Sequence, residues 1–377
     1  MDNDVRPEPP SVATDPHPDS GDGRPDLAST RLARLANSTQ QVAMRMAQAN
    51  SVKGLRQAAL QVDTLIVALR SQGAGIELTM DVVSELGDLL LARLWQVLAP
   101  QELVRNSCLI VMGSEGRGEQ TLKTDQDNGL LLRDGYTFDE MPDLAASFTS
   151  ALFDFGYPLC PGGIMLSNTR WRQSLSEFRE TIRRWCYEPD SDGVMQLAIV
   201  LDARAIAGDS GLLADAKRHL WAILPDSDAF FARFTSPVGQ FDHVGNNWWH
   251  WLAPRHGERH QAVDLKKSGS FQIVHGVRAL ALKNHVDAVS TRERLRSLVE
   301  HHGMPAALAC DLREALHLLI ALRLDHQLRL RRLGRPSDNL VDFRALGTLE
   351  HAQIDSVMAI VKNFRQYLQL HCPFEML

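Results

Sequence analysis

Two aspartates separated by one residue, Asp125 and Asp127, are the side chains in this sequence best spaced for chemistry. They precede a short apolar run, residues 130–132, which is typical of a strand. Side chains two apart in a strand point to the same face, so we expect both carboxylates to project together. Adjacent carboxylates repel each other unless a cation lies between them. A hard divalent ion such as Mg²⁺, with oxygen ligands and substrate phosphates, fits that position.

Two apolar runs and a glycine-rich turn would hold these aspartates in place. Residues 108–112 read Cys-Leu-Ile-Val-Met, which is short enough for a buried strand. Gly113, Gly116 and Gly118 follow, and glycine lets backbone amides approach a ligand closely. The pattern predicts a strand, a glycine-rich turn and a second strand beside both carboxylates.

The sixteen residues from Gly113 to Asn128, GSEGRGEQTLKTDQDN, resemble a known signature. Gly-Ser, a spacer and Asp-x-Asp look like the polymerase-β-type nucleotidyltransferases. The complete stretch resembles the nucleotidyltransferase family related to PII uridylyltransferases, whose bacterial members are often fused to CBS and cyclic-nucleotide-binding domains. The later stretches PLCPGGIM, LDARAIAGD and VDLKKSGSFQIVHGVRALAL are also similar to that family, so the resemblance covers roughly residues 30–375.

The resemblance implies an in-line attack on the α-phosphorus of a nucleoside triphosphate, in which two Mg²⁺ ions can stabilise the entering and leaving oxygens. It makes Asp125 and Asp127 the catalytic carboxylates and metal ligands. Gly113 and Ser114 would hold the phosphates with backbone N–H groups and a hydroxyl. Arg117 would clamp two phosphate oxygens with its guanidinium fork.

Other charged residues each have two interpretations. Lys123 is either a point charge on phosphate or a solvated loop lysine, and Glu119 either lines the cleft or pairs with Arg117. Lys266 and Arg278 would line the cleft in one interpretation, where Lys266 reaches phosphate and Arg278 stacks on a base. In the other interpretation they belong to a solvated helix start and a structural ion pair.

The sequence departs from the superfamily in one respect, because many active members place a third carboxylate on a later strand. The candidate strand here, residues 159–166, contains no acid. Asp202 or Asp192 would substitute from the following helix, unless Asp202 pairs with Arg204 or with a neighbouring helix. The departure bears on catalytic competence and not on the fold.

Histidines and tryptophans are concentrated in residues 243–260. His256 and His260 have the i, i+4 spacing that suits zinc on a helix. Gly257 and not glutamate follows His256, so the His-Glu-x-x-His pattern is absent, and no cysteine is close. We therefore expect a loop that packs over the cleft or contacts a partner.

The composition of the 377-residue chain, 44% hydrophobic and 23% charged, is typical of a globular protein with two or three domains. A formal net charge of −6 argues against general nucleic-acid binding. Five scattered cysteines without paired spacing fit a reducing cytoplasm. We expect no secretory signal and no membrane segment, because no run approaches about 20 apolar residues.

The chain divides into four segments. Residues 1–26, rich in Pro, Asp, Gly and Ser, predict a disordered tail. Residues 27–100 show helical periodicity, for a helical region that is either plain core or a docking and homodimerisation bundle. Residues 101–211 alternate strands and helices and would form the nucleotidyltransferase-like domain, and residues 212–377 predict a C-terminal helical domain.

The expected fold class is α+β: a small mixed sheet of nucleotidyltransferase type covered by helices, flanked by an N-terminal helical region and a C-terminal helical bundle. In the central segment we expect a third strand over 157–160 that continues at 164–166, and helices over 138–155, 171–185 and 193–207. The clearest C-terminal helices are 262–285, 291–302, 305–332 and 348–370.

These observations predict a Mg²⁺-dependent enzyme that moves a nucleoside monophosphate from an NTP to an acceptor hydroxyl. By the resemblance, the acceptor would be a PII-like protein in a bacterial-type signal transduction system, with UTP or ATP as donor. The alternative is a catalytically degenerate module that senses nucleotides or contacts a partner protein. The missing third carboxylate favours that alternative.

Overall fold

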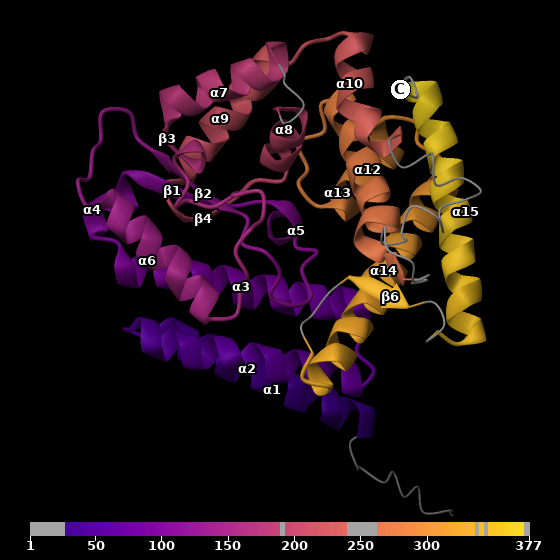
Figure 1. Ribbon diagram of the computed structural model, residues 1–377, viewed down its shortest axis with the longest axis horizontal. Helices are drawn as coiled ribbons and strands as arrows, with labels where there is room; N and C mark the ends of the chain where they lie inside the picture. Colours follow the sequence, from indigo (N-terminus) through magenta and orange to yellow (C-terminus); the bar gives the residue numbers. More distant parts are fainter. Residues whose placement is uncertain (1–26, 189–192, 240–261, 336–338, 343–345, 373–377) are drawn as a thin grey trace, which may run out of the picture.

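The structure is a computed structural model that describes residues 27–188, 193–239, 262–335, 339–342 and 346–372 (Figure 1). The expected disordered tail, residues 1–26, and the Trp- and His-rich stretch, residues 243–260, lie outside the described residues. Helices predominate around one small mixed sheet, which confirms the α+β class.

The central sheet has four strands in the order β3-β2-β1-β4. Their bounds are β1 Ser107–Val111, β2 Asn128–Leu132, β3 Arg172–Ser174 and β4 Arg204–Gly208. β1 pairs antiparallel with β2 and β4, whereas β2 pairs parallel with β3. β1 and β2 are the two apolar runs that the sequence predicts on either side of the glycine-rich turn.

Helices before and around the sheet supply its covering layers. They are α1 Leu27–Gln48, α2 Val52–Ser71, α3 Ile76–Leu98, α4 Gln101–Arg105, α5 Gly113–Gly116, α6 Met141–Asp154, the 3₁₀ turn η1 Thr169–Trp171, α7 Leu175–Tyr187, α8 Gly193–Leu201 and α9 Ser210–Ile223. α3 and α6 lie against one face of the sheet, and α7 and α9 lie against the other (Figure 1).

Side chains of β1 alternate between these two layers because successive residues of a strand point to opposite faces. Leu109 and Val111 join the core formed with α2, α3 and α6. Cys108 and Ile110 join the core formed with α7, α8 and α9. The apolar stripe of α3 is thus buried against the sheet, and that of α2 is buried against α1, α3 and α6, which is the plain-core interpretation of that region.

The C-terminal part is a helical bundle with one small added sheet. Its elements are α10 Asp228–Gly239, β5 Ala262–Asp264, the π-helical turn η3 Lys266–Ser270, α12 Phe271–Lys283, α13 Thr291–His301, α14 Ala306–Arg332, β6 Leu340–Asp342 and α15 Thr348–His371. Among the described residues, no helix combines the length and apolar character that a membrane span requires.

The prediction of one helix over residues 193–207 is wrong. α8 ends at Leu201, and β4 begins at Arg204. The backbone N–H groups of Asp202 and Ala203 bond to carbonyls three residues earlier, so the helix tightens and stops. The mostly apolar segments on either side of Asp202 do not by themselves distinguish a buried helix from a strand, which is why the prediction ran through the boundary.

The expected strand over 157–160 and 164–166 is a loop instead. It lies beside the start of β2, because Asn128 N donates to the carbonyl of Ile164 at 3.1 Å. Prolines 158 and 161 lack backbone donors, and Gly163 has a positive φ of 65°, so the segment does not form a regular ladder.

The third strand is β3, which falls inside the helix expected over 171–185. α7 begins only at Leu175, after a capping box in which Ser174 and Glu177 bond to each other's backbone N–H groups. The Ser-x-x-Glu spacing carries this start signal in the sequence. The helix expected from residue 262 likewise starts later, at Phe271, because β5 pairs with β6, far along the chain.

Candidate functional site

The glycine-rich turn brings Asp127 against the start of α5. α5 begins at Gly113, directly after β1, and Met112 N donates to the carbonyl oxygen of Asp127 at 2.8 Å. Gly113 has a φ of +58°, and a Cβ there would lie 2.4 Å from Oδ2 of Asp127. Only glycine leaves room for this carboxylate beside the backbone.

The two predicted carboxylates, Asp125 and Asp127, are both partly buried and interact electrostatically. The pKa of the Asp127 carboxyl is raised to about 6, chiefly by burial and in part by the charge of Asp125. A hydrogen bond from the Cys160 thiol and the charge of Lys266 oppose this rise. A cation shared by the two carboxylates would remove both the repulsion and the cost of burial.

This pair fits a hard divalent cation. Mg²⁺ commonly binds through one or two carboxylates plus substrate phosphates, and not in an all-protein cage. The described ranges hold no group of three or more His, Cys, Asp or Glu side chains arranged for a metal. Asp125 and Asp127 would therefore hold the ion together with the phosphates of a nucleotide. The zinc candidates His256 and His260 lie outside the described residues.

A cavity of about 260 Å³ opens in front of Asp127, between the sheet and the C-terminal helices. Its wall is formed by Gly113, Ser114, Arg117, Glu119, Asp127, Met195, Ile199, Asp202, Lys266, Ser270, Phe271, Val274, Arg278, Leu316, Ile320 and Arg323. Eight candidates from the sequence thus meet in one place: Gly113, Ser114, Arg117, Glu119, Asp127, Asp202, Lys266 and Arg278. Asp125 interacts with Asp127 from just outside this wall.

One buried carboxylate, Asp202, organises the far side of the cavity. Its oxygens accept hydrogen bonds from Arg117 at 2.6 Å, Arg278 at 2.5 and 3.1 Å, and Arg294 at 2.8 Å. Burial alone would raise the pKa of Asp202, but the three guanidinium groups hold it below its usual range. Asp202 does not pair with Arg204, which binds Asp88 instead.

Arg117 is held on both sides and does not lie free for phosphate. Its Nε donates to Glu119 at 2.6 Å, and its Nη1 donates to Asp202. Glu119 in turn accepts from the backbone N–H of Thr291 at 3.0 Å. The sequence interpretation of Glu119 as the ion-pair partner of Arg117 is confirmed, and both residues also line the cavity.

The structure does not bring Lys123 to the cavity. Its Nζ is buried against α2, where it donates to the carbonyl of Ala59 at 2.8 Å and to Asp63 at 3.0 Å. Lys266 does lie at the cavity, exposed on η3. Arg278 forms a structural ion pair with Asp202 and also lines the cavity, so parts of both interpretations apply to it.

Two arginines at or beside the cavity, Arg294 and Arg323, were not predicted from the sequence. Arg294 donates to Asp202 and to the carbonyl of Leu201. Arg323 lines the cavity and is 6% exposed. A signal was present for Arg323, because it continues an apolar helix stripe through Leu316 and Ile320. Nothing local marks Arg294.

A second buried acid, Glu115, makes folding sensitive to pH. Its side chain is 5% exposed, and Oε1 has no hydrogen-bond partner. Burial, assisted by the charges of Asp88 and Asp127 and opposed by Arg204, raises the pKa of Glu115 to about 8. The folded state holds this proton more tightly than the unfolded state. The associated stability is therefore complete below about pH 4.5 and is lost as the pH rises through 8.

Replacement of Glu115 by glutamine should remove this loss. We expect the stability of Glu115→Gln relative to the wild type to increase by up to about 4 kcal/mol between pH 5 and pH 9. Urea unfolding across that range measures the difference. The exposed Glu140→Gln is the matched control and should follow the wild type. A difference between Glu115→Gln and the wild type that does not change with pH would contradict this assignment.

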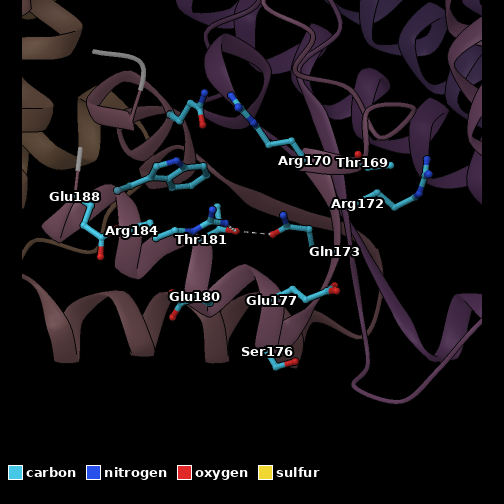
Figure 2. Close-up of a pocket in the computed structure, with 12 residues that line it drawn as sticks. Thr169, Arg170, Arg172, Gln173, Ser176, Glu177, Glu180, Thr181, Arg184 and Glu188 are labelled. Carbon is cyan, nitrogen blue, oxygen red and sulfur yellow. Dashed lines mark hydrogen bonds between the residues drawn. The ribbon is translucent and has the colours of Figure 1, made fainter. Parts of the chain in front are cut away.

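A larger open groove of about 910 Å³ lies between β3 and α7 and is lined by polar and charged side chains (Figure 2). Arg170, Glu180 and Glu188 are among them, and Thr181 donates to Gln173 at 3.0 Å within the groove. Its lining includes none of the residues predicted for the site. Size alone therefore does not identify the functional cavity.

A mixed sheet with a carboxylate pair beside a glycine-rich turn is the arrangement of a nucleotidyltransferase. A family model described as "Putative nucleotidyltransferase DUF294" matches residues 60–192. A second, described as "Putative nucleotidyltransferase substrate binding domain", matches residues 228–372. The chain belongs to this nucleotidyltransferase family. No curated protein matches the chain.

Proposed function

We propose that the protein is a Mg²⁺-dependent enzyme that transfers a nucleoside monophosphate from an NTP to an acceptor hydroxyl. The observation that carries this proposal is the position of Asp127, against Gly113 and within the cavity. Asp125 and Asp127 hold the metal, which supplies positive charge to the reacting phosphates. The backbone amides at Gly113 and Ser114 and the Ser114 hydroxyl receive the phosphate oxygens.

Arg117 has a changed role in this proposal. Because Glu119 and Asp202 already engage it, it contributes positive potential at the cavity wall and does not close as a clamp on phosphate. Lys123 is left out of the phosphate set, since Asp63 and Ala59 hold its ammonium group. Lys266 takes its place as the exposed cation at the cavity.

The acceptor we propose is a hydroxyl on a PII-like signalling protein, with UTP or ATP as donor. Support comes from the similarity of Gly113–Asn128 to the uridylyltransferase-related signature. A cavity of about 260 Å³ has the scale of a small-ligand site, so a protein acceptor would present its hydroxyl from outside.

A nucleotide-sensing module without turnover is the second candidate. It is favoured by the state of Asp202, the substitute for the missing third carboxylate. Three arginines occupy both of its oxygens, so it is not available as a metal ligand or a general base. A sensor would bind NTP and Mg²⁺ at the same carboxylates and release no product.

Pyrophosphate release separates these candidates. We expect the purified chain to release pyrophosphate from UTP or ATP in the presence of Mg²⁺ and a PII-like acceptor, and to label that acceptor with radioactivity from α-³²P NTP. EDTA should abolish both signals, and excess Mg²⁺ should restore them. Tight NTP binding without pyrophosphate from any NTP, even with cell extract as acceptor source, would favour the sensor.

A further inference from the structure

Arg323 of α14 is a buried cation without a counterion. Its side chain lines the cavity that holds Asp127, is 6% exposed, and its Nε has no hydrogen-bond partner. In the described part of the chain, no carboxylate lies within ion-pair distance of its guanidinium group. The other three buried arginines at this site, by contrast, share Asp202.

The acids that act on Arg323 from a distance are already engaged. Asp264 and Glu119 both raise its pKa, although burial outweighs them and lowers it. Asp264 accepts hydrogen bonds from the backbone N–H groups of Lys266 and Lys267, at 3.0 and 3.1 Å. Glu119 binds Arg117 and the backbone of Thr291. Both oxygens of Glu119 are thus engaged, and both backbone bonds to Asp264 fall on Oδ1. Neither acid forms an ion pair with Arg323.

An unpaired buried guanidinium is costly, and arginine does not escape the cost by losing its proton. Its neighbours one turn earlier on α14, Leu319 and Ile320, are apolar and offer no acceptor. Gln327, one turn later, carries a buried side-chain oxygen that has no partner, but it is neutral. An anion bound in the cavity would supply the missing counter-charge, and a guanidinium fork matches two phosphate oxygens.

A second cation in the wall of the same cavity comes from an element that packs against α14. η3 carries Lys266 to the cavity, and it lies against α14, since a Cβ on Gly269 would come within 2.6 Å of Leu319. Lys266 and Arg323 thus come from two elements in direct contact. Asp127 and Gly113 lie on the sheet side of the same cavity.

We propose that Arg323, with Lys266 in the same cavity wall, binds the β- and γ-phosphates of the nucleotide, so that the C-terminal helices hold the pyrophosphate that leaves. This proposal rests on the proposed function, in which Asp125 and Asp127 hold the metal. The acceptor hydroxyl oxygen forms a bond to the α-phosphorus as the bond from that phosphorus to the α,β-bridging oxygen breaks, and the hydroxyl proton passes to solvent. Pyrophosphate leaves with the bridging oxygen, and Arg323 neutralises charge on that leaving group.

The test is binding of inorganic tripolyphosphate, UTP and UMP by calorimetry to the full chain. Arg323→Met keeps an unbranched apolar stem and removes the guanidinium group with its charge. We expect affinity for tripolyphosphate and UTP to fall about 10- to 100-fold, with UMP affinity unchanged. Arg323→Lys should be intermediate, because it keeps the charge and loses the fork. The exposed Arg329→Met on the same helix is the control and should bind like the wild type.

Thermal unfolding shows whether Arg323 is merely structural. Because Arg323 has no ion-pair partner to lose, the melting temperature of Arg323→Met should equal or exceed that of the wild type. Unchanged tripolyphosphate and UTP affinity in Arg323→Met, or equal losses for UTP and UMP, would overturn the assignment. These results are independent of turnover: absence of pyrophosphate release from the wild type would refute the transfer reaction and leave the polyphosphate site standing.

Discussion

The double variant Asp125→Asn/Asp127→Asn should lose nucleotidyl transfer by at least about a thousandfold while remaining folded. Both carboxylates would hold the metal, and asparagine keeps their shape without their charge. Removal of the raised-pKa Asp127 carboxylate also relieves its repulsion with Asp125, so no loss of stability is expected. The measurement is the rate of pyrophosphate release at saturating Mg²⁺.

The exposed Asp139→Asn, on the loop before α6, is the matched control and should retain wild-type activity. Mg²⁺-dependent NTP affinity should fall in the double variant under both the enzyme and the sensor interpretations. A folded double variant with undiminished transfer would exclude Asp125 and Asp127 as the metal ligands.

Asp202→Ala should be the most destabilising single substitution in the cavity wall. It leaves Arg117, Arg278 and Arg294 as buried charges without their shared carboxylate, at a cost of about 3–5 kcal/mol. These arginines come from the turn after α5, from α12 and from α13, so the contact between the sheet and the C-terminal helices should loosen. Urea unfolding at neutral pH gives the magnitude.

Asp215→Ala provides the control for this experiment. Asp215 pairs with Arg218 on the surface of α9, and exposed pairs of that kind contribute about 1 kcal/mol or less. If Asp202→Ala unfolds like the wild type but loses Mg²⁺-dependent activity, Asp202 is a third catalytic carboxylate and not the centre of an arginine cluster.

Local features of the site could be read from the sequence. One continuous segment, residues 107–132, contains β1, the glycine-rich turn and β2. Its apolar runs and glycines predict these elements from neighbouring residues alone. The pairing of Arg117 with Glu119 is also local, since the two residues are two positions apart.

Features that depend on distant contacts could not be read in this way. The arginines that bind Asp202 lie 85, 76 and 92 residues from it along the chain. Only Asp202 and Ala203 separate α8 from β4, and the pairing of β4 with β1 is what defines it as a strand. Lys123 stands inside the signature, yet its side chain turns toward α2, and spacing along the chain does not encode that direction.

The location of a bound metal tests the central claim most directly. A crystal grown with Mn²⁺ and a nonhydrolysable NTP would reveal the ion by its anomalous scattering. We expect a peak about 2.1 Å from carboxylate oxygens of Asp125 and Asp127 and in contact with the triphosphate. A triphosphate bound in the cavity with no Mn²⁺ at either aspartate would contradict the assignment.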